Sequence, residues 1–176
     1  MMDVVPTSIV SFETALGRCA IRWSRHGISG VLLPQRTSAP LPAIETGTEV
    51  PSPVRHAIEG IVGVMAGEAL SLQDVVLDER DVEPFARTVY AATRTIPPGS
   101  TRSYGEIAHA IGRPGGAQDV GAALGRNPFP IIVPCHRVVA ANGALTGFSA
   151  PGGLATKRRM LELEGVPGYG QLTMFG

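Results

Sequence analysis

Cysteine is scarce in this sequence. Only Cys19 and Cys135 occur among 176 residues, too few for a disulfide framework or for the four Cys or His ligands of a common structural zinc site. The other histidines stand at no metal-ligand spacing from Cys135, so we expect neither a metal nor a cofactor. A free thiol fits a reducing setting, and we expect a cytoplasmic protein.

Long apolar runs are also missing, since none reaches the roughly 18 residues needed to cross a bilayer. The first ten residues show no secretory leader. The formal net charge is zero, but acids dominate residues 1–84 and bases dominate residues 85–176. This asymmetry favours two domains, 1–80 and 81–176, the second with an anionic partner. An uneven but solvated surface is the alternative.

Residues 1–80 have the pattern of a small α/β domain. The runs SIVSFET, CAIRWS and GISGVLLP predict antiparallel strands joined by tight turns, and Cys19 should be buried in one of them. Residues 37–53 predict a loop. Apolar positions 54, 57, 58, 61 and 65 predict a helix after Ser52. The run LQDVVLD (72–78) predicts one more strand.

Residues 81–176 have a mostly helical pattern. Asp81 can cap a first helix that ends at PPG. Ser103 and Glu106 form a capping box, GRPGG is a turn, and AQDVGAALG is a second short helix. This pair describes a helix-turn-helix, although many helical hairpins never meet DNA. A closing helix ends at Gly165.

Cys135 stands in the stretch PIIVPCHRVV. Prolines 128, 130 and 134 stiffen the chain before it. A reactive thiol needs a base, and that base needs an orienting acid. His136 adjoins the thiol, and Glu162 and Glu164 are candidate acids. A packed thiol is the alternative, but it would need neither the histidine nor the prolines. We therefore interpret Cys135 as a nucleophile.

The motif PCHRVV, preceded by GRNPFPIIV, with SYGEIA upstream and GFSAPGG…LELEG downstream, resembles the O6-alkylguanine-DNA alkyltransferases. These are also called methylated-DNA–protein-cysteine methyltransferases. The resemblance covers residues 85–165 densely and the first domain loosely. It implies a suicide DNA repair enzyme that takes an alkyl group from O6-alkylguanine, and also from O4-alkylthymine, onto its own cysteine. Its partner would be double-stranded DNA. We also expect a monomer with no membrane association, near the nucleoid if the source is bacterial.

The resemblance also assigns roles to single residues. Cys135 would accept the alkyl group, and His136 would be the general base, acting through a water. Glu164 would orient that histidine. Asn127 would brace the turn that carries the cysteine. Tyr104 would donate a proton or a hydrogen bond to the leaving guanine.

Further residues would hold the substrate. The backbone carbonyls of Cys135 and Val138 would face the flipped base, and Phe148 and Ser149 would form the lid of its pocket. The helix-turn-helix would lie in the minor groove. The residues expected to contact DNA are Ser103, Ala117, Gln118, Arg126 and Arg137.

Two features depart from the family's pattern. Gln118 stands where the family commonly has an arginine, and Asp119 follows it; the loop FSAPGG is longer by two residues than the common version. Two other functions stay open. One is lesion binding without efficient transfer, against which the presence of Cys135 argues. The other is a thiol transferase acting on a non-DNA substrate, to which Gln118 and Asp119 add weight.

Overall fold

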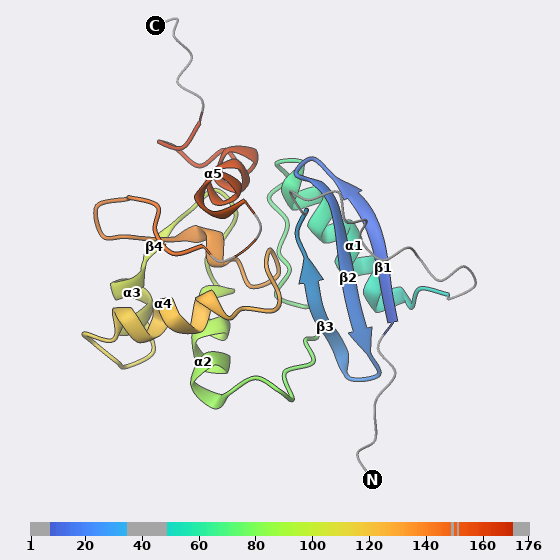
Figure 1. Ribbon diagram of the computed structural model, residues 1–176, viewed down its shortest axis with the longest axis horizontal. Coiled ribbons are helices and arrows are strands. Elements are labelled where there is room, and N and C mark those ends of the chain that lie inside the picture. Colours follow the sequence, from blue (N-terminus) through green and yellow to red (C-terminus); the bar gives the residue numbers. More distant parts are fainter. Residues whose placement is uncertain (1–7, 35–48, 149, 151, 171–176) are drawn as a thin grey trace, which may run out of the picture.

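An antiparallel sheet forms the first part of the chain. The computed structural model describes residues 8–34, 49–148, 150 and 152–170. Strands β1 (Ser8–Thr14), β2 (Gly17–Ser24) and β3 (Gly27–Leu32) pair in the order β1-β2-β3. Figure 1 shows this sheet with helix α1 (Ser52–Met65) behind it. The three strands expected from SIVSFET, CAIRWS and GISGVLLP, and the helix expected after Ser52, are confirmed.

Alternation along β2 explains why this sheet forms. Cys19, Ile21 and Trp23 are buried, whereas Arg18 and Arg22 are exposed. Successive side chains of a strand point to opposite faces, so Cys19, Ile21 and Trp23 share one buried face, while the other face carries the two exposed arginines and the buried Ala20. Burial raises the pKa of the Cys19 thiol to about 11. Cys19 is therefore a packed and unreactive thiol, as expected.

The strand expected at residues 72–78 is wrong. The segment makes only one bridge to the sheet, between Leu77 and Ile28. The Ile28 amide donates to the Val76 carbonyl at 2.9 Å, but further along the same edge the Val31 amide donates to the Pro128 carbonyl at 2.9 Å. The edge of β3 is thus shared between two segments. Neither has enough of this edge to pair with it as a fourth strand.

Four further helices, joined by long loops, follow in the described part of the chain. They are α2 (Pro84–Thr93), α3 (Tyr104–Ala110), α4 (Ala117–Gly125) and α5 (Gly153–Leu163), with the short parallel strands β4 (Arg102–Ser103) and β5 (Val138–Val139) between them. Asp81 does not cap α2, because the N-cap position lies two residues later. Glu83 is the N-cap and Pro84 is the first helical residue, a position where its missing amide hydrogen is no loss.

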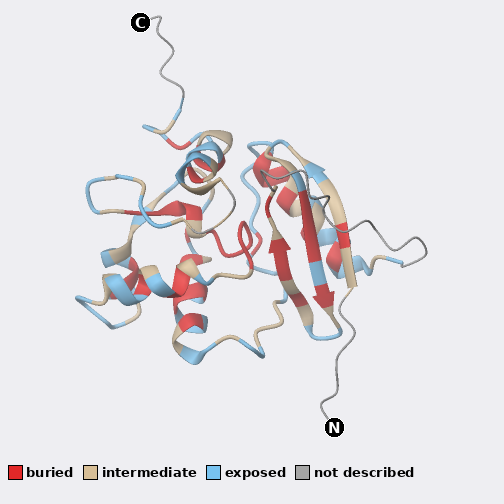
Figure 2. Cartoon of the chain, in the orientation of Figure 1, coloured by how far each residue is buried: buried red, intermediate tan, exposed pale blue. Residues whose placement is uncertain are grey.

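One apolar core runs through the molecule. Buried residues of the sheet, of α1 and of the later helices form a single cluster. Figure 2 shows the centre of the molecule, including the loop before Cys135, as buried. In the ranges that the structure describes, no helix is long and apolar enough to span a membrane. Within these same ranges no group of His, Cys, Asp or Glu could hold a metal ion.

Candidate active site

Helices α3 and α4 form the expected helix-turn-helix. The Glu106 amide donates to Ser103 Oγ at 3.1 Å, and the Ser103 amide donates to Glu106 Oε2 at 2.7 Å, so the capping box is confirmed. Gln118 is exposed on α4, and Arg126 is exposed directly after it. Asp119 pairs with Arg113 at 3.5 Å, which offsets much of its negative charge at this surface.

The loop that leads to Cys135 is stabilised by hydrogen bonds from the side chain of Asn127 to its backbone. Asn127 Nδ2 donates to the Val133 carbonyl at 2.9 Å, and Asn127 Oδ1 accepts from the Phe129 amide at 2.8 Å. Ile131, buried in this loop, has a φ of 74°, which a β-branched residue rarely adopts. Such strain costs on the order of 1–3 kcal/mol and persists only where neighbouring bonds impose it. Asn127 supplies two of those bonds.

Behind the thiol lies a buried ionic cluster. His136 and Glu164 are joined at 2.8 Å between Nε2 and Oε1, and both side chains are fully buried. Arg137 donates from Nε and Nη2 to the same carboxylate at 2.9 and 2.7 Å. Burial alone would raise the pKa of Glu164, but His136 and Arg137 outweigh it and hold that pKa at about 2. Glu164 is therefore a carboxylate at neutral pH.

The carboxylate fixes the tautomer of His136. An ionised carboxylate only accepts hydrogen bonds, so Nε2 of His136 must carry the hydrogen. Nδ1 then presents its lone pair, and it is buried without a hydrogen-bond partner among the described residues. Burial lowers the pKa of His136 more than Glu164 raises it, so the ring is neutral at pH 7. A neutral imidazole with a free lone pair can act as a base.

The Cys135 thiol needs such a base. Burial raises its pKa, and the Asn127 side chain and the Lys157 charge oppose the rise only in part. The resting group is thus a thiol, and the thiolate must be produced at the time of reaction. Cys135 and His136 are neighbours in one turn of 3₁₀ helix (Cys135–Arg137).

Lys157 also lies at this site, although the sequence did not single it out. It is fully buried and donates to the carbonyls of Val138 and Thr146 at 2.7 and 3.0 Å. It also donates to the Tyr104 hydroxyl at 3.3 Å, and that hydroxyl donates to the Thr146 carbonyl at 2.9 Å. A cation thus sits beside the phenol. It would stabilise negative charge on the phenol oxygen.

A helical spacing could have revealed this lysine. Lys157 precedes Met160 and Leu161 by three and four residues, and residues at these separations share one face of a helix. Met160 and Leu161 are fully buried, so the same face carries Lys157 inward. Its place beside two arginines in the sequence suggests a solvated cluster instead.

Two side-chain or backbone groups expected at the DNA or the substrate have other partners in the structure. The expectation that Arg137 contacts DNA is wrong: its side chain is buried, and its donors are directed to Glu164 and to the Ile96 carbonyl at 2.7 Å. The Val138 carbonyl, expected to face the substrate, already accepts from Lys157. Ser149 lies outside the described residues, whereas Ala117 is half-buried at the first position of α4.

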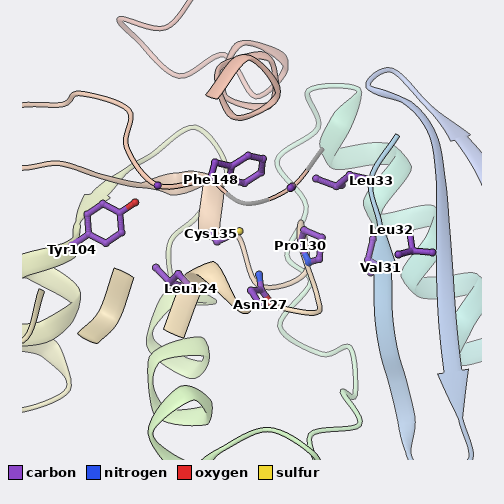
Figure 3. Close-up of a pocket in the computed structure, with 11 residues that line it drawn as sticks. Val31, Leu32, Leu33, Tyr104, Leu124, Asn127, Pro130, Cys135 and Phe148 are labelled. Atoms are coloured by element: carbon purple, nitrogen blue, oxygen red, sulfur yellow. The ribbon is translucent and has the colours of Figure 1, made fainter. Parts of the chain in front are cut away.

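A cavity of about 180 Å³ opens in front of the thiol (Figure 3). It is lined by four of the residues singled out from the sequence, Tyr104, Asn127, Cys135 and Phe148. His136 and Glu164 lie behind it, while Gln118 and Arg126 are on the outer surface. The structure thus brings Cys135, Tyr104, Asn127 and Phe148 to one cavity, and His136 directly follows Cys135 in the chain.

Fold and site together define a thiol-dependent transferase carrying a helix-turn-helix. A family model described as 6-O-methylguanine DNA methyltransferase, DNA binding domain, matches residues 84–166. The methylated-DNA–protein-cysteine methyltransferase of Mycolicibacterium paratuberculosis is 49% identical over 128 residues, which are 73% of this chain and 75% of that protein. The protein of the same name from Mycobacterium leprae is 53% identical over 120 residues, 68% of this chain and 70% of the relative. The chain belongs to the methylated-DNA–protein-cysteine methyltransferase family.

Solved structures agree with the fold. The structure of Mycobacterium tuberculosis OGT in complex with DNA has a TM-score of 0.72 at 40% identity, covering 89% of this chain and 92% of the other. The O6-methylguanine-DNA methyltransferase of Pyrococcus kodakaraensis has a TM-score of 0.66 at 26% identity, covering 92% and 100%. The expected fold, a small antiparallel sheet with a helix followed by a helical part with a helix-turn-helix, is confirmed.

Proposed function

We propose that this protein repairs DNA by taking an alkyl group from O6-alkylguanine, and from O4-alkylthymine, onto Cys135. The single observation that carries the proposal is the position of Cys135 between the cavity and the buried His136–Glu164 pair. A relative that is 49% identical over 128 residues, 73% of this chain, bears the name of that activity. The protein acts once, because a thioether is not readily cleaved by water.

The chemistry is a displacement at a saturated carbon. His136 Nδ1 takes the thiol proton, directly or through a water, and the sulfur attacks the alkyl carbon. A carbon–sulfur bond forms while the bond between that carbon and guanine O6 breaks. No oxyanion develops at the carbon under attack, so no oxyanion hole is needed. Glu164 stabilises the imidazolium that forms, because its carboxylate is ionised and lies at 2.8 Å.

Tyr104 serves the leaving group in this proposal. A neutral guanine leaves more readily than its anion, so a proton or hydrogen bond supplied to its ring lowers the barrier. Lys157 supports this role, because its ammonium donates to the phenol oxygen and lowers the cost of negative charge there. Asn127 braces the loop that carries Cys135. The backbone carbonyls of Cys135 and Val138 hold the flipped base.

Residues 81–176 form the DNA-binding and alkyl-acceptor domain of this proposal, and residues 1–80 support it. Helices α3 and α4 enter the minor groove, and the damaged base rotates out of the duplex into the cavity. Ser103, Ala117, Gln118 and Arg126 belong to this surface. We expect a cytoplasmic monomer, in the compartment that holds the DNA.

Intact-mass spectrometry tests the proposal directly. The protein is incubated with a duplex that contains one O6-methylguanine, and its mass should rise by one methyl group per molecule, located on Cys135. Cys135→Ala should bind the same duplex and gain no mass. Unmodified wild-type protein bound to the duplex would instead indicate lesion binding alone. Absence of both binding and transfer would favour a thiol transferase with a non-DNA substrate.

A further inference from the structure

The cavity in front of Cys135 is built from both parts of the chain. One side comes from the helical part and from the loop that carries Phe148. The other side comes from the end of β3 and the residue after it, at residues 31–33. Apart from Cys135, Tyr104 and Asn127, the residues that line it are glycine or apolar, namely Val31, Leu32, Leu33, Leu124, Pro130, Gly147, Phe148 and Ala150.

The two sides face different parts of a substrate. Figure 3 shows Tyr104 at one end, the β3 residues at the other, and Cys135 between them. The leaving base lies toward Tyr104 in the proposed function. In a displacement, the sulfur, the alkyl carbon and the leaving oxygen stand in line, so the rest of the alkyl group projects sideways from that line. The apolar space toward β3 is the volume open to it.

The wall at β3 is held firmly. Val31 and Leu33 are 4% and 2% exposed, and the Val31 amide donates to the Pro128 carbonyl at 2.9 Å. That bond ties β3 to the loop that carries Cys135. Figure 3 shows Leu33 extending toward Cys135 and Phe148, whereas Leu32 extends to the opposite side of the strand. This alternation is what extended backbone requires.

We infer that Val31 and Leu33, contributed by the sheet, set the size and polarity of the alkyl group that the protein accepts. The inference rests on the proposed function and names its substrate class: O6-alkylguanines with uncharged hydrocarbon chains of several carbons, besides methyl. Each added methylene that is buried against this wall contributes roughly fourfold to binding. A chain that ends in a carboxylate is disfavoured on this side, because the β3 residues that line it are apolar and the buried Lys157 lies at the Tyr104 end.

Competing repair rates test the inference. Three duplexes carry O6-methyl-, O6-butyl- or O6-(3-carboxypropyl)guanine at the same position, and the rate of each is measured by intact mass. For each variant, the repair rate of the butyl lesion is divided by that of the methyl lesion, and this butyl-to-methyl ratio is compared with that of wild type. Changes in DNA binding and in thiol activation affect both rates equally and cancel. Leu33→Phe narrows the cavity and should lower this ratio by about tenfold, which corresponds to the loss of between one and two buried methylenes. Leu33→Ala should raise it.

Two further variants guard against a change in folding. Val31→Ile adds one methylene to the same wall and should lower the butyl-to-methyl ratio severalfold. Leu77→Ala is the matched control, because Leu77 is a leucine beside the same sheet that does not line the cavity. It should leave the ratio unchanged. In wild type, the carboxypropyl lesion should react more slowly than the butyl lesion of similar length.

The outcomes separate this inference from the proposed function. Suppose that wild type transfers methyl, but the ratio of the butyl rate to the methyl rate is the same in wild type and in the variants at positions 31 and 33. That result would overturn the inference and leave the proposed function standing. A carboxypropyl rate equal to the butyl rate would also overturn it, since the wall would then be indifferent to charge. Absence of methyl transfer by wild-type protein would overturn the proposed function itself.

Discussion

Replacing Glu164 with glutamine removes the charge on which two buried partners depend. The carboxylate binds His136 and Arg137, and the three side chains are 0%, 0% and 6% exposed. Its pKa is about 2, against 4.5 for an ordinary glutamate. At about 1.4 kcal/mol for each pH unit, this difference corresponds to about 3 kcal/mol of folding stability at neutral pH. Breaking a buried ion pair costs a similar amount, about 3–5 kcal/mol.

The stability that Glu164 contributes depends on pH. The folded-state pKa of Glu164 lies below its unfolded value, so the stabilisation is present above about pH 4.5 and is lost as the pH falls through about 2. Urea unfolding of Glu164→Gln at pH 7 should show about 3 kcal/mol less stability than wild type. That difference should shrink toward pH 2, where wild-type Glu164 is also protonated.

A matched control lies two residues earlier on the same helix. Glu162 pairs with Arg159 at 3.5 Å, and the arginine is 53% exposed. Glu162→Gln should therefore change the free energy of unfolding by less than about 1 kcal/mol. Equal losses of stability in the two variants, or a loss in Glu164→Gln that is the same at every pH, would contradict this prediction.

Activity should follow the same change. Without the charge that stabilises the imidazolium, alkyl transfer by Glu164→Gln should slow by about a hundredfold or more, within the usual contribution of general base catalysis. Alkylation of Cys135 by iodoacetamide, followed against pH, should shift to higher pH. An unchanged profile would remove the His136–Glu164 pair from thiol activation.

The remaining predictions concern other parts of the site. Gln118→Arg should speed repair of duplex lesions by roughly tenfold, through one added charge-assisted contact of about 1–3 kcal/mol, and leave the reaction with a free alkylated guanine base unchanged; equal gains on both substrates would contradict it. Lys157→Met should slow transfer from duplex and free base alike, by about tenfold or more, because the phenol loses its cation; a loss confined to duplex would contradict it. Ser103→Ala should lower the melting temperature, since losing an N-cap costs about 1 kcal/mol; an unchanged melting temperature would show that the cap contributes nothing.

The sequence alone predicted those features whose interacting residues are close together in the chain. The capping box of Ser103 and Glu106 spans three residues, and both of its hydrogen bonds are present. The apolar spacing after Ser52 predicted α1, because residues that share a helix face are fixed by the helical repeat. The roles proposed for Cys135 and His136 rest on a motif whose residues are adjacent in the chain, and they stay predictions.

Long-range contacts account for what the sequence analysis missed. Lys157 is buried because the loop that supplies the Thr146 carbonyl folds over α5, a contact that no local pattern encodes. Arg137 is buried because Glu164, 27 residues further on, lies against it. The run at 72–78 has strand-like composition, but the edge of β3 that it would have extended is taken at Val31 by Pro128.

Lys157 is the only lysine in the chain, and it is fully buried. Every other permanently positive side chain is an arginine, so no lysine amine reaches solvent. Guanidinium groups keep their charge to pH values above 12 and are not substrates for lysine acetylation. The positive charge that such a surface offers to DNA is therefore insensitive to acetylating enzymes and to amine-directed reagents. Amine-reactive dyes or crosslinkers would find no exposed lysine on the folded protein.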